Sequence, residues 1–390
     1  MVAAIPDPAL KRESAANVAS LARGQRIAVL DGLRGIAILL VLLWHGFFSI
    51  PFQSTILAKI RVLGTLSWSG VDLFFVLSGF LIGGILLDVR SSPRYFTTFY
   101  IRRAYRILPL YLLVLACEAL WPLLVHGFPV QSAEAGPIPF AAYVLFVQNF
   151  WMAWLGTFGG VAAGVTWSLA IEEQFYLTVP LLVRRISRRS LVMSLMFVIV
   201  AAPALRVLAR FMFPGRNFAA YVLMPCRADA LCCGVLCAVL TRTPDLWQKL
   251  AARRSALAVA AIAATPGLAW LTYERYSPFA GLTITVGYSL LAFFYSCVLL
   301  LALTGSEWLQ KILSARALKA LGQVAYFVYL FHLPIMEIVR LLSAIRFAYW
   351  SPAVRFLSGG LGIALTLGLG KLSWRFYEEP LLRRGHRHSY

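Results

Sequence analysis

The sequence predicts an all-α membrane protein that crosses the bilayer about ten times, with both termini in the cytoplasm. Of its 390 residues, 60% are hydrophobic and only 13% are charged, whereas soluble domains carry about 25% charged residues. Apolar runs of roughly 17 to 24 residues recur, the length that spans a hydrocarbon core of about 30 Å as a helix. The expected spans lie near 36–52, 69–89, 107–126, 165–183, 191–211, 224–241, 255–273, 281–304, 322–345 and 352–372.

The basic charge balance is explained by membrane topology. The formal net charge is +20, and clustered Lys and Arg often mark nucleic-acid binding because they neutralise phosphates. Here the arginines flank the apolar runs, as expected where Lys and Arg concentrate in cytoplasmic loops. We therefore expect the lipid bilayer as the surroundings and no nucleic-acid partner.

The concentration of Lys and Arg in cytoplasmic loops also decides whether a shorter apolar stretch near 140–155 spans the membrane. If this stretch spanned the membrane, every later loop would change sides, and the basic run at 184–189 would lie outside. We therefore expect an interfacial or re-entrant segment, because irregular backbone at membrane depth must be shielded from lipid. The outer segment from Gly127 to Gly164 that contains it has no Lys or Arg, and its tryptophans and glycines fit plain anchoring at the outer interface or a lid over an acceptor site.

The ends of the chain and its cysteines carry weaker signals. Residues 1–26 are polar and Ala-rich, which predicts a disordered cytoplasmic tail before a membrane domain at 27–384 and a short cytoplasmic tail at 385–390. The six cysteines lie in or beside apolar runs, without the loop spacing of a disulfide framework. We interpret them as small buried residues and expect no metal; the alternative is a metal site built from Cys232, Cys233 and Cys237.

Two histidines are the strongest candidates for chemistry, because ionisable side chains inside a bilayer are costly and mark functional sites. His45 lies 11 residues beyond Arg34, hence roughly 16 Å deeper along the same helix. His332 lies about ten residues into its own expected helix, or about 15 Å. We expect both imidazoles at one depth, near the membrane centre. The alternative for each is a core histidine bonded to a backbone carbonyl.

Three carboxylates, Asp72, Glu172 and Glu173, are expected to enter the membrane from the outer side. A carboxylate beside an imidazole can orient the ring and stabilise its cation, which favours a histidine that acts as a base. The alternative is a structural salt bridge to one of the arginines in or beside the spans, namely Arg206, Arg227 and Arg340.

A cluster of charged residues is expected where the first and third helices begin on the cytoplasmic side. Arg103 and Arg106 are three residues apart, hence on one helix face, and arginine forks bind phosphate in bidentate fashion. The cluster could equally attract lipid headgroups. Together with the histidines, it predicts a transfer reaction from a phosphorylated cytosolic donor to an acceptor from outside. The cluster contains Asp31, Arg34, Arg102, Arg103 and Arg106.

At these residues the sequence resembles the acyltransferase-3 family of integral membrane O-acyltransferases, from about Leu30 to Arg384. The resemblance implies transfer of an acyl group, usually acetyl, from cytosolic acyl-CoA to an extracytoplasmic hydroxyl on a glycan such as O-antigen or exopolysaccharide. It implies a multi-pass protein of the bacterial inner membrane with no permanently bound cofactor. The matching pieces are LDGLRGIAILLVLLWH (30–45), GVDLFFVLSGFLIGGIL (70–86), YIRRAYRILPLY (100–111), WSLAIEEQFYL (167–177), LGQVAYFVYLFHLPI (321–335) and WRFYEEPLLRR (374–384).

The resemblance also suggests roles for individual residues. His45 matches the essential histidine, Arg34 the arginine of the same motif, and Arg103 with Arg106 the paired arginines. We expect His45 to act as general base, with an acyl-histidine relay as the alternative, and the arginines to bind the donor's phosphates. Glu172 falls in the motif WSL-x-x-E and is the second catalytic candidate. Supporting candidates are Asp31, Asp72, Glu173 and His332, with Ser78, Tyr326 and Tyr329 as possible oxyanion donors.

Two departures from the family pattern affect the expected mechanism. Many members carry an extracytoplasmic esterase-like domain after the membrane region, so the membrane domain itself or a partner protein is expected to complete the transfer here. The family's usual Ser or Thr near the late motif is replaced around Val324 and Ala325. The rival functions are a transporter or flippase of a glycan or lipid precursor, and a non-catalytic subunit of a polysaccharide export complex.

Overall fold

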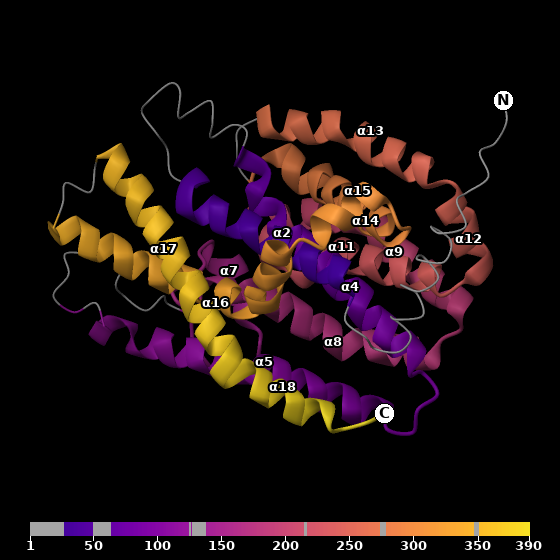
Figure 1. The fold of residues 1–390 in the computed structure, drawn as a ribbon, viewed down its shortest axis with the longest axis horizontal. Coiled ribbons are helices and arrows are strands. Elements are labelled where there is room, and N and C mark those ends of the chain that lie inside the picture. Colours follow the sequence, from indigo (N-terminus) through magenta and orange to yellow (C-terminus); the bar gives the residue numbers. More distant parts are fainter. Residues whose placement is uncertain are drawn as a thin grey trace.

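The computed structural model describes residues 27–49, 64–124, 126, 138–213, 217–273, 278–346 and 351–390. Within these ranges the regular structure is helical and no strand occurs (Figure 1). The expected tail at 1–26 lies outside the described residues. Ten of the described helices have 16 or more residues: α2 (Ala28–Leu43), α4 (Gly70–Asp88), α5 (Tyr95–Leu124), α8 (Trp167–Arg185), α9 (Arg188–Met212), α11 (Met224–Thr241), α13 (Arg254–Tyr273), α14 (Tyr288–Leu303), α16 (Arg316–Arg346) and α17 (Pro352–Ser373).

The predicted fold class is confirmed. Nine helical segments of the described chain are long and apolar enough to cross a membrane. Helix α8 is not among them, since its 19 residues include two glutamates and two arginines. The chain is a multi-pass membrane protein, and the side on which its termini lie stays a prediction. Shorter elements are α10 (Asn217–Val222), α12 (Pro244–Ala252), α15 (Glu307–Leu313), α18 (Glu379–His386) and the 3₁₀ or π turns η1 (Trp44–Phe48), η2 (Thr65–Ser69), η3 (Gly164–Thr166), η4 (Thr283–Gly287) and η5 (Trp374–Glu378).

The stretch near 140–155 forms two short helices, α6 (Phe140–Val144) and α7 (Gln148–Leu155). The eight residues of α7 extend only about 12 Å, so neither helix can span the bilayer. Gln148 and Asn149 are fully buried and donate to the backbone carbonyls of Thr166 and Val222. The segment is therefore folded into the protein, while Trp151 and other aromatic residues on it stay exposed.

Glycines allow two pairs of central helices to approach closely. A Cβ on Gly35 would lie 2.1 Å from the carbonyl oxygen of Leu318, and one on Gly322 would lie 1.9 Å from that of Asp31. These contacts bring α2 against α16. Gly79 plays the same part between α4 and α11, where a Cβ would lie 2.0 Å from the carbonyl oxygen of Leu231. In Figure 1, α2, α4 and α16 lie between α13 at one edge and α5 at the other.

Candidate active site

The first candidate residue, His45, lies on a widened helical turn. Helix α2 begins at Ala28, earlier than the expected Ile36, and continues after Leu43 as the π-helix η1. The early start is possible because Asp31 and Arg34 form an ion pair of 3.1 Å inside the helix. His45 therefore lies in the last turn of this span. Single π turns inside α-helices often mark functional sites.

His45 and His332 contact each other, so the two imidazoles lie at one level, while their expected position near the membrane centre stays a prediction. Nε2 of His332 lies 3.2 Å from Nδ1 of His45, and the ring centroids are 4.7 Å apart. Each ring also bonds to a backbone carbonyl of its own helix, which was the alternative interpretation for each histidine. The carbonyl of Val41 lies 3.0 Å from Nδ1 of His45, and that of Tyr329 lies 2.8 Å from Nδ1 of His332.

His45 lines a large cavity, which we call the histidine cavity. It has a volume of about 650 Å³ and lies among α2, α16, α17 and the loop that precedes α8. Its wall combines aromatic and aliphatic side chains with three charged groups, and it resembles the pockets that bind organic ligands, which combine apolar walls with a few polar groups. The aromatic lining residues are Trp44, Trp68, Phe158, Trp167, Tyr221, Phe279 and Tyr329; the charged ones are Glu337, Arg340 and Arg355.

The loop before α8 is held against α5 by Glu118. The backbone N–H of Ala163 donates to this buried carboxylate at 2.9 Å. A Cβ on Gly160 would lie only 1.5 Å from Oε1 of Glu118, so the close approach requires glycine. Gly160 itself lines the histidine cavity. This loop lies within the expected outer segment 127–164, whose role as a lid over an acceptor site stays a prediction.

A second, smaller cavity of about 130 Å³ contains the predicted arginines, and we call it the arginine cavity. Three arginines and one carboxylate line it, so its charge is positive. Glu172 interacts electrostatically with all three arginines and with Ser78. Ser78 in turn bonds to the hydroxyl of Tyr176 at 2.6 Å. The polar lining residues are Arg34, Ser78, Arg103, Arg106, Ser168, Glu172, Tyr176, Tyr326 and Tyr329.

The two cavities adjoin. Val71 and Tyr329 line both of them, and the hydroxyl of Tyr329 bonds to Ser168 at 2.6 Å. The structure therefore brings the arginines, Glu172 and Tyr326 together on one side of this shared wall, of which Tyr329 is a part. It places His45 on the other side, with His332 behind it. Tyr326 donates its hydroxyl proton to the carbonyl of Ile107, so that proton is already engaged.

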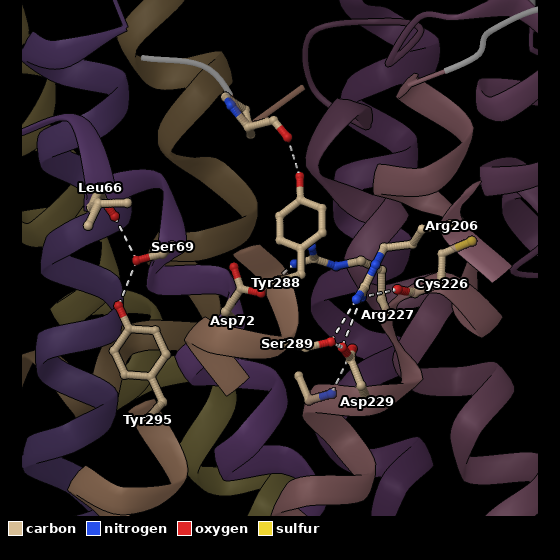
Figure 2. Close-up of polar contacts among 12 residues, drawn as sticks. Leu66, Ser69, Asp72, Arg206, Cys226, Arg227, Asp229, Tyr288, Ser289 and Tyr295 are labelled. Atoms are coloured by element: carbon tan, nitrogen blue, oxygen red, sulfur yellow. Dashed lines mark hydrogen bonds and ion pairs between the residues drawn. The ribbon is translucent and has the colours of Figure 1, made fainter. Parts of the chain in front are cut away.

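The expectation that a carboxylate orients an imidazole needs correction. Asp72 forms a buried ion pair with Arg227 at 2.7 Å, which is the structural alternative (Figure 2). Glu172 lies in the arginine cavity, and Oε1 of Glu173 is buried without a hydrogen-bond partner in the described residues. The side-chain partner of His45 is the ring of His332. Helix rotation, which a single sequence does not reveal, decides which residue faces the ring.

The buried ion pairs form a network around Tyr288. The guanidinium of Arg227 lies 3.7 Å from the centre of the Tyr288 ring. A second pair joins Arg206 to Asp229 at 2.8 Å, and Ser289 donates to the same carboxylate (Figure 2). Both pairs are nearly inaccessible to solvent. These charges connect α4, α9, α11 and α14 and line neither cavity.

Removal of one member of the Asp72–Arg227 pair should destabilise the protein strongly. We expect Asp72→Leu to lower the free energy of unfolding by about 3–5 kcal/mol, because it leaves a buried arginine without its charge partner. The double variant Asp72→Leu/Arg227→Met should show a smaller decrease in the free energy of unfolding. Glu379→Gln, which removes the exposed pair with Arg383, should change it by about 0–1 kcal/mol. Unfolding in detergent measures all three, and equal losses for the single and double variants would contradict the assignment.

Sequence reasoning missed several lining residues. Ser168 and Tyr176 lie four residues before and after Glu172, on the same face of α8, so helical spacing could have indicated them. Glu337 and Arg340 follow His332 on α16 and bond to each other. No pattern in one sequence distinguishes that pair from an ordinary ion pair. The glycines of the loop before α8 were noted in the sequence, but nothing in the pattern placed them beside His45.

The fold is that of a multi-pass helical membrane protein with two adjoining internal cavities. The family described as an acyltransferase domain matches residues 27–370. The chain therefore belongs to the acyltransferase-3 family of membrane acyltransferases, as its motifs indicated. No solved structure matches it.

Several curated proteins resemble the chain over nearly its whole length. It is 25% identical to the O-acetyltransferase OatA of Staphylococcus aureus over 371 residues, which cover 91% of this chain and 57% of that protein. It is 28% identical to the putative peptidoglycan O-acetyltransferase YrhL of Bacillus subtilis, with 92% and 55% covered. The peptidoglycan O-acetyltransferase OatA of Listeria monocytogenes is 26% identical, with 91% and 56% covered. The chain thus spans little more than half the length of these relatives.

Proposed function

We propose that the protein is a membrane O-acyltransferase that moves an acetyl group from acyl-CoA to a hydroxyl of an extracytoplasmic glycan. The observation that carries the proposal is the shared wall between the arginine cavity and the histidine cavity. It supports a donor on one side of Tyr329 and Val71 and an acceptor on the other. The family and the names of the relatives support acyl transfer as the reaction.

The arginine cavity is the proposed donor site. Arg34, Arg103 and Arg106 can form charge-assisted bidentate bonds to the phosphates of a nucleotide carrier. Asp31 pairs with Arg34 and limits its rotamers. Glu172 lies among the three cations, so its proposed role is to hold the guanidinium groups in place when no phosphate is near them.

In the proposed reaction, the acceptor hydroxyl oxygen attacks the thioester carbonyl carbon of the donor. Nε2 of His45 takes the hydroxyl proton as the new C–O bond forms. The C–S bond then breaks, the thiolate leaves, and the proton on His45 passes to its sulfur. The products are the ester and free CoA thiol. A base in this position typically contributes about 10²- to 10⁴-fold to such a step.

The histidine cavity is the proposed acceptor site. Its aromatic faces suit the apolar faces of sugar rings, and Glu337, Arg340 and Arg355 offer polar partners for hydroxyl or acidic groups. The names of the relatives make peptidoglycan the first acceptor to test. O-antigen and exopolysaccharide, which the sequence interpretation favoured, are the others.

The direct test is the incorporation of labelled acetyl from acetyl-CoA into alkali-labile esters by the purified protein in vesicles. We expect incorporation that depends on the donor and on a glycan acceptor. Glycan movement without any acyl donor would instead support the transporter or flippase. Incorporation that requires a second, added protein would support the expected partner.

Loss of one cavity arginine should weaken donor binding more than chemistry. We expect Arg103→Gln to raise the KM for acetyl-CoA roughly 10- to 100-fold with a small change in kcat, because a charge-assisted hydrogen bond contributes about 1.5–3 kcal/mol. The matched control is Arg102→Gln. Its side chain bonds to the carbonyl of His388 outside the cavity. Equal KM values for both variants would remove the arginine cavity as the donor site.

A further inference from the structure

We propose that His332 is a positioning residue that fixes the tautomer and orientation of His45, so that Nε2 of His45 is the atom that receives the proton. The inference rests on the proposed function and deepens it. It starts from the chain of contacts that runs from the histidine cavity through His45 and His332 to the backbone of α16.

The directions of the hydrogen bonds follow from what each atom can donate. Nδ1 of His332 lies 2.8 Å from the carbonyl of Tyr329 and 3.1 Å from that of Val328. A carbonyl only accepts, so Nδ1 of His332 carries the hydrogen. A neutral imidazole has one N–H, and its other nitrogen is an acceptor. Nε2 of His332 therefore presents a lone pair to His45.

The same reasoning assigns the tautomer of His45. Its Nδ1 faces the lone pair of His332 at 3.2 Å and the carbonyl of Val41 at 3.0 Å. Both neighbours are acceptors, so Nδ1 of His45 is the N–H. Nε2 of His45 is then the basic nitrogen, and it has no hydrogen-bond partner among the described residues. Since His45 lines the histidine cavity, this nitrogen is available to an acceptor hydroxyl.

A second imidazole does here what a carboxylate does in a hydrolase triad. It fixes the tautomer and accepts a hydrogen bond from the imidazolium that forms during proton transfer. His332 is fully buried and lines neither cavity. A carboxylate in that place would bury a charge, which is expensive without a paired cation. The neutral ring supplies the lone pair without adding a charge.

The kinetic test compares two substitutions at one position. His332→Gln keeps an acceptor oxygen near the position of Nε2, whereas His332→Leu removes it. We expect His332→Leu to lower kcat about 10²-fold or more at unchanged KM for donor and acceptor, since loss of the group that fixes a histidine tautomer costs about 10⁴-fold in a hydrolase triad. The kcat of His332→Gln should be at least about tenfold higher than that of His332→Leu. Phe331→Leu, a buried neighbour on α16, controls for packing. Equal losses for Gln and Leu, or a change in KM alone, would overturn the proposal.

A spectroscopic measurement separates this inference from the proposed function. Nitrogen NMR of ¹⁵N-histidine-labelled protein in lipid, with the His45 signals assigned by their loss in His45→Asn, reports the tautomer without any transfer assay. In the native protein we expect His45 to be in the Nδ1–H tautomer alone. In His332→Leu we expect His45 to populate both the Nδ1–H and the Nε2–H tautomers. An Nε2–H tautomer in the native protein would refute the role of His332 even if transfer occurs. Absent transfer with the Nδ1–H tautomer would refute the proposed function alone.

Discussion

Replacement of His45 with alanine should abolish acetyl transfer while leaving the protein folded. We expect kcat to fall about 10²- to 10⁴-fold, because the acceptor hydroxyl loses the base that removes its proton. The KM for acetyl-CoA should change little, since the arginine cavity lies beyond Tyr329. Incorporation of labelled acetyl into alkali-labile esters measures the effect at matched membrane abundance.

The control for this variant is His126→Ala, which replaces an exposed histidine that lines neither cavity. Native incorporation by His45→Ala would exclude a catalytic role for that ring. The relay alternative has its own signature: labelled acetyl would remain attached to the protein when acceptor is omitted. That attachment should disappear in His45→Ala.

Gly322→Ala should disable the site by forcing α2 and α16 apart at a position that lines the arginine cavity. Its new Cβ would lie 1.9 Å from the carbonyl oxygen of Asp31, so α2 must move away from α16. That movement would separate His45 from His332 and displace Arg34. Overpacking of this kind typically costs about 1–3 kcal/mol, and we expect transfer per folded molecule to fall at least about tenfold, because misplaced catalytic groups lose rate steeply.

The matched control is Gly360→Ala on α17, where no atom lies within 4 Å of the added Cβ. That variant should keep native transfer and native or slightly higher thermal stability, since alanine favours helix over glycine. Thermal unfolding in detergent and transfer per folded molecule are measured together. If Gly322→Ala kept the native unfolding temperature and the native transfer rate, the α2–α16 contact would tolerate separation and the prediction would be wrong.

Much of the fold could be predicted because the bilayer imposes a simple length requirement on apolar runs. The distribution of loop arginines also indicated that 140–155 does not span, and the two short helices α6 and α7 agree. The start of the first helix was wrong because Asp31 and Arg34 interrupt the apolar run. Their ion pair and the glycine contacts with α16 allow the helix to continue through them.

The candidate residues could be named from the sequence, but their pairings could not. Ionisable groups in apolar runs indicated His45 and His332, since such groups are rare in membranes, and clustering at the helix ends indicated the arginines. Which of them meet depends on the rotation of each helix about its axis, and close glycine contacts set that rotation. Asp72 therefore pairs with Arg227 on α11, and Glu172 lies among the arginines, although both are near His45 in the expected topology.

The shared wall of Val71 and Tyr329 bears on the distance over which an acyl group must be moved in a reaction across a membrane. If donor and acceptor bind in the two cavities as proposed, the acyl group moves past one side chain rather than across a bilayer of about 30 Å. The crossing then becomes a matter of effective concentration, because two bound reactants held in register react as if at very high molarity. Selection on such a protein would act on the alignment of the two cavities more than on the affinity of either one.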